Sequence, residues 1–282
     1  MKSIIIRRKG LGMTSCREIA AQTNHEFEVI RNDREMPNEV DLCIRWGCTS
    51  NVPTRNILNN ARAIHQVNDK LEFRRTLEAA DEPLAPKTWF STVSWLEDSP
   101  RYPNVVVRPS RHAQGRNLLS VNRWNTGDME KLRTFTRKFP NYYIGEFIDK
   151  VEEFRMFVVS GKVAAVAKKT PGNPDDVAWN VAKGGRFDNV RWDAWNLPAV
   201  ALAVKGFNLT GLDFGGVDVM VDNSNVPFIL EINSAPSLTS PYRQSCMAKA
   251  FDYIMDNGKD RMPLTDSSES YRKYIHPAIL NR

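Results

Sequence analysis

Two short apolar runs in the last third of the chain decide the fold. Residues 216–222 read GVDVMVD, residues 226–233 read VPFILEIN, and a polar turn joins them. We expect the two runs to pair as a hairpin. Side chains alternate across a strand, so Glu231 and Asn233 share one face, roughly 6–7 Å apart along it, and Asp218 faces away from its valine neighbours. In such a hairpin Asp218 comes near Glu231.

These three polar side chains predict a metal site. Carboxylate and amide oxygens are the hard ligands that a Mg²⁺ ion bound to nucleotide phosphates takes. A buried face would not tolerate two unpaired carboxylates. The alternative is an ordinary surface hairpin with its polar residues turned outward, and the hairpin alone does not decide between the two.

Composition describes a globular chain with a moderate positive charge. Its 282 residues suffice for one large domain or two to three small lobes. The net charge of +6 suits an anionic ligand such as ATP, or a nucleic acid, and does not distinguish them. No apolar run approaches the ~20 residues that span a bilayer, so we expect no membrane partner. The apolar stretch after Met1 is too short for a secretory signal.

The chain contains four cysteines, none of them in a CxxC pair or at zinc-binding spacing from histidines. They are Cys16, Cys43, Cys48 and Cys246. We expect free, packed thiols in a reducing cytoplasm.

The pattern of apolar and polar residues divides the chain into lobes. Strand-like and helix-like pieces alternate over residues 1–85, which is typical of a small α/β lobe. Prolines at the end of this segment indicate a hinge. We expect a central lobe at 86–150, a C-terminal lobe with the metal site at 151–262, and a polar tail at 263–282.

Seven short motifs follow one another in a fixed order. They are DKLE at 69–72, VRP at 107–109, EFI at 146–148, EFRMFVVSGKV at 153–163, WNVAKGG at 179–185, GVD at 216–218 and LEINSAP at 230–236. This order resembles the ATP-grasp superfamily, and within it the carboxylate–amine ligases related to ribosomal-protein glutamate ligase. The resemblance covers roughly residues 65 to 240. It implies an α/β fold in which an N-terminal α/β lobe precedes two lobes that clamp ATP.

The resemblance implies a nucleotide site at the motif EFI. Glu146, Phe147 and Ile148 would form the hinge strand whose backbone bonds adenine, with Glu146 reading the exocyclic amine. Glu153 would hold the ribose hydroxyls, with Asp149 as the alternative.

Two basic positions of the family contact the nucleotide, and here they are Lys70 and Arg108. Position 108 is usually lysine in the family. Arginine is also a cation, but it is planar and forked, so the geometry of its contact is open.

The same resemblance implies the catalytic groups. Arg155 and Lys183 would stabilise the γ-phosphate or an acyl phosphate, and Asn180 would shape the substrate loop. Lys183 lies in the long polar segment 170–186, which we expect to close over the reacting phosphate. The neighbouring pair at 168–169 is interpreted as a solvated, basic strand edge.

The expected activity is that of an ATP-dependent ligase. ATP would phosphorylate a carboxylate, and an amine would attack the acyl phosphate to form an amide or peptide bond. Asp218, Glu231 and Asn233 would carry Mg²⁺, with Mn²⁺ as an alternative. The partners are therefore ATP, a carboxylate and an amine, with a protein tail or a modified nucleic acid as polymer acceptors.

Two other functions remain open on the sequence. One is a small-molecule kinase on the same scaffold, which stops at phosphoryl transfer. The other is a nucleic-acid-binding or assembly protein that has kept the fold without catalysis. The complete Asp218, Glu231 and Asn233 set argues against the second of these.

Overall fold

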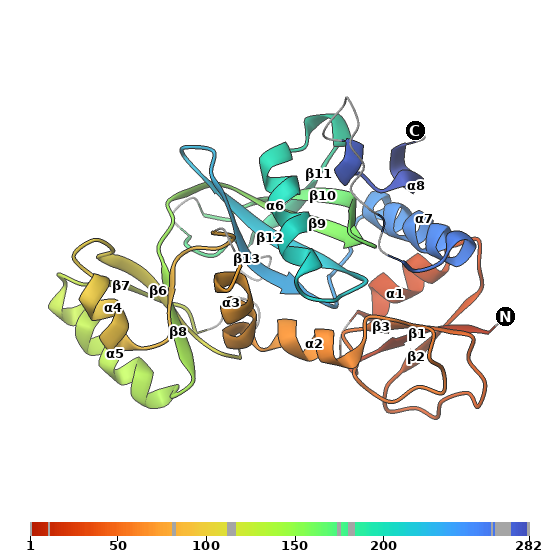
Figure 1. The fold of residues 1–282 in the computed structure, drawn as a ribbon, viewed down its shortest axis with the longest axis horizontal. Coiled ribbons are helices and arrows are strands. Elements are labelled where there is room, and N and C mark those ends of the chain that lie inside the picture. Colours follow the sequence, from red (N-terminus) through yellow and green to blue (C-terminus); the bar gives the residue numbers. More distant parts are fainter. Residues whose placement is uncertain are drawn as a thin grey trace.

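The structure is a computed structural model with three β-sheets that follow one another along the longest axis of the molecule (Figure 1). It describes residues 2–10, 12–80, 83–111, 117–173, 176–179, 184–260, 262 and 272–280. The strands of the three sheets lie within 3–58, 88–146 and 150–233. The predicted lobe boundaries at 85, 150 and 262 stay predictions.

The N-terminal sheet is parallel, in the order β2-β1-β3-β4. Its elements are β1 (Ser3–Arg7), α1 (Met13–Ala20), β2 (Phe27–Arg31), β3 (Leu42–Trp46) and β4 (Ile57–Leu58). Parallel sheets are apolar on both faces because both are covered. Accordingly, Ile5 and Ile44 pack with α1 in the main core, and Ile4 and Ile6 belong to a separate cluster on the other face.

Two short helices, α2 (Ala61–Asn68) and α3 (Lys70–Glu78), lead from this sheet to the central lobe (Figure 1). The side chain of Asp69 caps α3 by accepting from Leu71 N and Glu72 N. The main-chain N–H of Asp69 donates to His65 O at the end of α2. This N-cap fixes where α3 begins and therefore where Lys70 lies.

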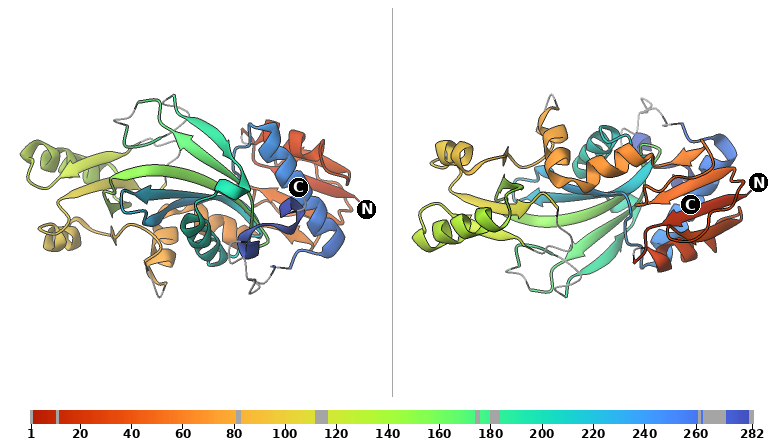
Figure 2. Two further views of the ribbon diagram at one scale, coloured as in Figure 1. Left: turned by 90° about the horizontal axis from the view of Figure 1, so that it is seen from above. Right: turned by 90° about the horizontal axis from the view of Figure 1, so that it is seen from below.

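The central sheet is antiparallel, in the order β5-β8-β6-β7. Its elements are β5 (Thr88–Trp89), α4 (Thr92–Asp98), β6 (Asn104–Pro109), β7 (Leu119–Asn122), α5 (Thr126–Lys138) and β8 (Tyr142–Glu146). Trp89, Trp95 and Leu132 belong to the core of this lobe, which is separate from the main core. The central lobe is thus a small body that projects from the five-stranded sheet (Figures 1 and 2).

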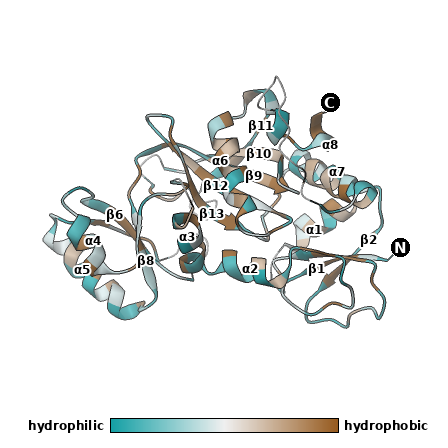
Figure 3. Ribbon diagram, in the orientation of Figure 1, coloured by the Kyte–Doolittle hydropathy of each residue, from teal (hydrophilic) through white to brown (hydrophobic). Residues whose placement is uncertain are grey.

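The third sheet has the order β11-β10-β9-β12-β13, and all its pairs are antiparallel. Its elements are β9 (Lys150–Val159), β10 (Lys162–Thr170), β11 (Arg186–Val190), η2 (Trp192–Ala194), α6 (Leu197–Asn208), β12 (Phe214–Asp222), β13 (Pro227–Asn233) and α7 (Pro241–Asn257). Ser160 and Gly161, both with positive φ, make the two-residue turn between β9 and β10. Helix α6 packs on one face of the sheet, where β12 and β13 carry long hydrophobic stretches (Figure 3).

The described part of the predicted tail packs into the core. It comprises η3 (Arg272–Tyr274) and α8 (Pro277–Leu280). Ile275 and Ile279 are buried in the main core, and His276 N donates to Val163 O at 2.8 Å. Tyr274 and Leu280 also pack against this core, so apolar residues anchor a segment that reads as polar.

All four cysteines are free and buried, as expected.

Across the described ranges, the helices lack the length and apolar character needed to cross a bilayer.

Candidate active site

The face of the third sheet that points away from α6 carries the predicted polar residues. The register sets Asp218 of β12 opposite Arg155 of β9 on one side and opposite Glu231 of β13 on the other. Asn233, two residues beyond Glu231, lies on the same face. The hairpin predicted from the two apolar runs is confirmed, and it brings Asp218 and Glu231 together.

Arg155 and Asp218 form a bidentate ion pair. Arg155 Nε donates to Asp218 Oδ1 at 2.6 Å, and Arg155 Nη2 donates to Oδ2 at 2.7 Å. Lys169 Nζ adds a third bond to Oδ2 at 2.8 Å. Burial favours the neutral acid, but the charges of Arg155 and Lys169 lower the pKa of Asp218 below its usual range. The carboxylate is therefore ionised at neutral pH although it is buried.

Lys169 corrects the interpretation of the basic pair at 168–169. Its side chain is only 4% exposed and donates to Glu153 Oε1 at 2.5 Å, whereas Lys168 is 44% exposed and pairs with Glu152. Burial opposes the charge of Lys169, but Asp218 and Glu153 raise its pKa. Strand alternation places Lys168 and Lys169 on opposite faces, but only the register, which pairs Ala167 with Arg155, shows that Lys169 is the one on the face of Arg155.

The predicted ribose contact of Glu153 is not supported by its surroundings. Its carboxylate is buried and is engaged by Lys169 on one oxygen and by Lys150 on the other. Asp149, the alternative, is exposed and lines the same pocket. Lys150 also lies over the ring of Trp179, 4.6 Å from its centroid.

Glu231 lies between Asn233 and Lys70. Asn233 Nδ2 donates to Glu231 Oε1 at 3.0 Å, and Lys70 Nζ lies 3.7 Å from Oε2. Burial would raise the pKa of Glu231, but the charge of Lys70 and the bond from Asn233 lower it below its usual range. Lys70 also donates to the carbonyls of Val67 and Ile232, at 3.2 and 3.3 Å. It is therefore held beside Glu231.

The donor set of these residues fits a divalent cation. Asp218 and Glu231 supply two ionised carboxylates and Asn233 supplies an amide oxygen, all hard ligands. Within the described ranges, no cluster of three His, Cys, Asp or Glu side chains is placed to hold a metal ion. An ion at this site would complete its coordination with water or with oxygens of a bound phosphate.

The predicted adenine hinge is partly occupied by the protein itself. Glu146 N donates to Lys87 O at 2.8 Å, and Phe147 N donates to Asn104 O at 3.2 Å. The carboxylate of Glu146 accepts from Lys87 N at 3.3 Å. The N–H of Ile148 makes no hydrogen bond to any residue that the structure describes. Of the three hinge N–H groups, Ile148 alone is thus free for a base.

Two arginines lie near the hinge, one predicted and one not. Arg108 lines the pocket, and its side chain forms no hydrogen bond or ion pair with the rest of the described chain. Arg74, which the sequence analysis missed, is 6% exposed and donates from Nη2 to Leu230 O at 2.8 Å. Its Nη1 has no partner in the described structure. Helical spacing could have identified Arg74, because it follows Lys70 by four residues and therefore lies on the same face of α3.

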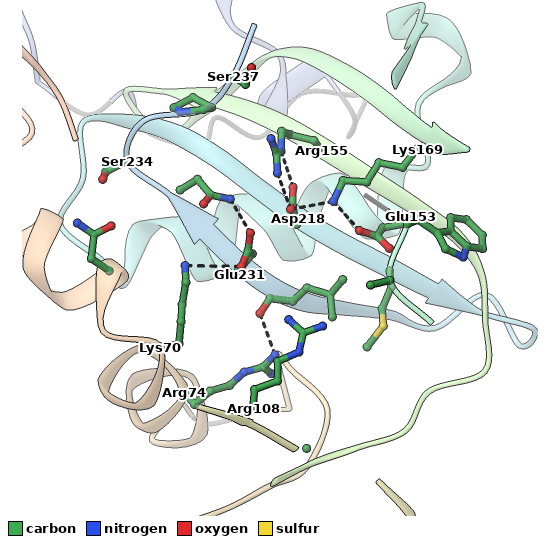
Figure 4. A pocket seen from close by; sticks show the side chains of 18 of the residues that line it. Lys70, Arg74, Arg108, Glu153, Arg155, Lys169, Asp218, Glu231, Ser234 and Ser237 are labelled. Atoms are coloured by element: carbon green, nitrogen blue, oxygen red, sulfur yellow. Dashed lines mark hydrogen bonds and ion pairs between the residues drawn. The ribbon is translucent and has the colours of Figure 1, made fainter. Parts of the chain in front are cut away.

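All these groups line one pocket of about 1700 Å³, shown from close by in Figure 4. Its other end is formed by the N-terminal lobe, with Arg8, Asn32 and Thr49, and by the loop that follows β13. The N-terminal lobe and this loop are in close contact at that end. Gly47 has a φ of +63°, and a Cβ on it would lie 2.7 Å from Ala235 Cβ. The pocket is therefore closed by contact between lobes that are distant in sequence.

Two predicted catalytic residues, Asn180 and Lys183, lie outside the described residues. Gly185 and Trp179, on either side of them, both line the pocket.

Solved structures with the same architecture are ATP-grasp ligases. D-alanine–D-alanine ligase from Bacillus anthracis is 15% identical with a TM-score of 0.68, over 92% of this chain and 97% of that chain. The ATP-grasp ligase PsnB, complexed with a minimal precursor, Mg and ADP, is 11% identical with a TM-score of 0.64, over 88% and 95%. A RiPP-associated ATP-grasp ligase from Chryseobacterium gregarium, in complex with ADP and a leader and core peptide, is 14% identical with a TM-score of 0.63, over 93% and 100%. At these identities the likeness establishes the ATP-grasp fold.

A comparison with curated proteins gives no match. The sequence model of the RimK-like ATP-grasp domain matches residues 105–254, more than half of the chain. This range holds the sheet face with Arg155, Asp218 and Glu231. The chain therefore belongs to the RimK-like ATP-grasp family.

Proposed function

We propose that this protein is an ATP-dependent carboxylate–amine ligase that works through an acyl phosphate. The observation that carries the proposal is the buried cluster of Arg155, Lys169 and Asp218, beside Glu231, on the floor of a pocket that three lobes share. Such a cluster combines cations for transferred phosphate with carboxylates for a metal ion.

The first step would be phosphoryl transfer. A carboxylate oxygen of the substrate forms a bond to the γ-phosphorus of ATP, the bond to the β–γ bridging oxygen breaks, and ADP leaves. Arg155 and Lys169 would hold the phosphoryl oxygens, where charge is spread during transfer. A Mg²⁺ ion held by Asp218, Glu231 and Asn233 would neutralise part of the phosphate charge.

The second step would be acyl transfer. The amine nitrogen of the acceptor forms a bond to the acyl carbon, the bond from that carbon to the phosphate oxygen breaks, and phosphate leaves as the nitrogen loses a proton. Lys183 and Asn180 would complete the site over the acyl phosphate. Their role is to exclude water, which would otherwise hydrolyse it.

ATP would lie along the edge between the central and C-terminal lobes. The free N–H of Ile148 would donate to the adenine ring, Asp149 would hold the ribose, and Arg108 would contact the phosphates. Lys70, beside Glu231, and the unpartnered nitrogen of Arg74 would add further positive charge along the same path. This arrangement moves the ribose contact from Glu153 to Asp149.

The second and third substrates would occupy the end near the N-terminal lobe. At about 1700 Å³ the pocket is larger than the ~300–1,000 Å³ typical of small-ligand sites, which leaves room for two substrates beside ATP. Arg8, Asn32 and Thr49 give this end a polar and cationic lining. A carboxylate carried by a polypeptide fits both features.

The test is to measure ADP, inorganic phosphate and acyl phosphate separately. The protein is incubated with ATP, Mg²⁺ and pools of candidate carboxylates in the presence of hydroxylamine, which traps acyl phosphates as hydroxamates. The ligase proposal expects a hydroxamate together with ADP and phosphate in equal amounts. ADP with a stable phosphorylated product and no free phosphate would instead identify the kinase. Absence of nucleotide binding by calorimetry would favour the non-catalytic, nucleic-acid-binding or assembly function.

A further inference from the structure

A second, shallower groove lies on the central lobe, away from the main pocket. It has a volume of about 580 Å³ and shares no lining residue with the larger pocket. One wall is the start of β7 with Leu118 and Leu119, and the other is helix α5 with Phe135 and Phe139. These four apolar side chains are only partly buried. The groove therefore presents apolar surface to the outside of the lobe.

The rim of the groove is charged. Lys131 and Lys138 of α5 line it and are exposed. Glu130 also lines it and is exposed, and its carboxylate pairs with Arg133 at 3.2 Å. Among the described residues, Lys131 pairs only with Asp128, at 3.1 Å and three residues away on the same helix. Exposed pairs of this kind contribute little to stability, so a better partner can replace Asp128.

Positive charge is concentrated in this lobe. Residues 86–146 contain ten Lys and Arg residues and five Asp and Glu residues, a net charge of +5 against +6 for the whole chain. Helix α5 lies on the outside of the lobe, away from the five-stranded sheet (Figure 1). This excess of positive charge would attract an acidic partner to the lobe.

We propose that the groove docks an acidic polypeptide segment. Apolar side chains of the segment would pack against Leu118, Leu119 and the two phenylalanines, and its carboxylates would face Lys131 and Lys138. The groove is less suited to nucleic acid, because bases need open ring faces. The two rings already pack together at 4.9 Å between centroids, and Lys138 Nζ lies 5.3 Å from the centroid of Phe139.

Docking here would place the polypeptide on a lobe that also lines the main pocket. Arg111, at the start of the connection between β6 and β7, lines the main pocket, and Asn117, at its end, lines the groove. A polypeptide held in the groove would be tethered to the lobe that clamps the nucleotide, which raises the local concentration of its reactive end. The docking itself does not depend on the proposed reaction, and it is measured by binding alone.

Helix α5 offers a matched pair of double variants. Both are made on a Glu130→Gln background, which removes the rim carboxylate that pairs with Arg133. Lys131→Glu with Lys138→Glu reverses the two groove cations, and Arg133→Glu with Arg137→Glu reverses two cations that do not line the groove. Each double variant reverses one cation in the middle of the helix and one in its last turn. The two proteins therefore differ in position and not in net charge or helix propensity. A third variant, Thr134→Trp, fills the groove without changing its charge.

The binding experiment uses fluorescence anisotropy with the full-length chain. The probe is a short fluorescein-labelled peptide of alternating leucine and glutamate, and the comparison peptides alternate serine with glutamate and leucine with lysine. We expect the leucine–glutamate peptide to bind at least about tenfold more tightly than either comparison peptide, because only it satisfies both the apolar walls and the cations. The double variant at Lys131 and Lys138, and Thr134→Trp, should each weaken binding of the leucine–glutamate peptide about tenfold or more. The matched control at Arg133 and Arg137 should weaken it by no more than about twofold.

Three outcomes would overturn the proposal. The first is absence of binding by the leucine–glutamate peptide. The second is equal loss in the two double variants, which would indicate general attraction to a basic surface. The third is equally tight binding of a single-stranded oligonucleotide that the double variant at Lys131 and Lys138 also loses, which would identify a nucleic-acid surface. Thermal unfolding of each variant, with and without ATP, shows whether its fold is intact.

Discussion

The guanidinium of Arg155 donates hydrogen bonds to both carboxylate oxygens of Asp218, at 2.6 and 2.7 Å. Lys169 adds a bond at 2.8 Å, so the predicted metal ligand is already neutralised by two protein cations. In the proposed function, phosphate oxygens would compete with Asp218 for the same two cations. A nucleotide that binds Arg155 and Lys169 would therefore release the carboxylate to a metal ion.

This relationship predicts that metal and nucleotide bind with strong mutual coupling. Free Mg²⁺ must displace two cations from Asp218, whereas Mg²⁺ arriving with a nucleotide finds them engaged by phosphate. We expect a non-hydrolysable ATP analogue to tighten Mg²⁺ binding about tenfold or more, within the usual range of coupling between sites. Isothermal titration of Mg²⁺ with and without the analogue measures this, and equal affinities would contradict it.

The adjacent lysines of β10 provide a controlled test of the cluster. Lys169→Met removes a buried cation that pairs with both Asp218 and Glu153. The loss should lower the unfolding free energy by about 3 kcal/mol. It should also lower ATP turnover strongly. Lys168→Met removes an exposed ion pair and should change stability by no more than about 0.5 kcal/mol. Denaturant unfolding measures the free energy of unfolding, and ADP release measures turnover. Similar values for the two variants would show that the buried position of Lys169 does not matter.

The hinge predicts selectivity for adenine. The free N–H of Ile148 suits an unprotonated ring nitrogen, which adenine has at the position where guanine carries a proton. ATP with Mg²⁺ should therefore raise the melting temperature through mass action, and GTP should do so much less. Thermal unfolding at matched nucleotide concentrations is the measurement. Equal stabilisation by GTP would remove the hinge assignment of residues 146–148.

A comparison of two glycines distinguishes the cost of backbone strain from the cost of a steric clash between lobes. Gly47 and Gly10 both have positive φ, +63° and +80°, so alanine costs roughly 1–2 kcal/mol at either position. A Cβ at Gly47 would lie 2.7 Å from Ala235, whereas nothing lies within 4 Å of one at Gly10. We expect Gly47→Ala to lose about 1–3 kcal/mol more stability than Gly10→Ala. Hydroxamate formation should fall more than ATP affinity, because the contact forms the substrate end of the pocket. Equal unfolding free energies for the two variants would show that the lobes adjust freely.

The buried His276 predicts loss of stability in mild acid. Burial, and to a lesser extent the charge of Lys162, lowers its pKa from 6.5 to about 4. Below pH 6.5 the unfolded chain takes up a proton that the folded chain excludes, so this contribution is complete above pH 6.5 and is lost as pH falls towards 4. Between pH 7 and 5 the loss should be about 2 kcal/mol. Comparing unfolding free energies of the wild type and His276→Phe at both values isolates it, and parallel pH profiles would contradict the assignment.

The hairpin that carries Asp218, Glu231 and Asn233 could be predicted because its determinants are local. The alternation of side chains has a period of two, and a short polar turn joins the runs, so the shared face follows from sequence distance alone. The register in the structure pairs Asp218 with Glu231 as expected. The metal role of the three residues stays a prediction that the titration of Mg²⁺ tests.

The surroundings of Glu153 and Lys169 could not be predicted from the sequence. Shifting the pairing of a strand by one residue moves every side chain to the other face, so register alone decides which of two adjacent lysines is buried. The same holds for Glu153, which reads as a free acid until Lys150 and Lys169 are placed around it.

The sequence by itself determined the ATP-grasp family, the order of its motifs and the residues of the predicted metal site, because these rest on short-range spacing and residue chemistry. Only the tertiary structure decided that Arg155 and Lys169 neutralise Asp218, that Arg74 joins the pocket, and that Gly47 meets Ala235. Those contacts join strands and loops far apart in the chain, and packing of whole lobes, not local pattern, brings them within bonding distance.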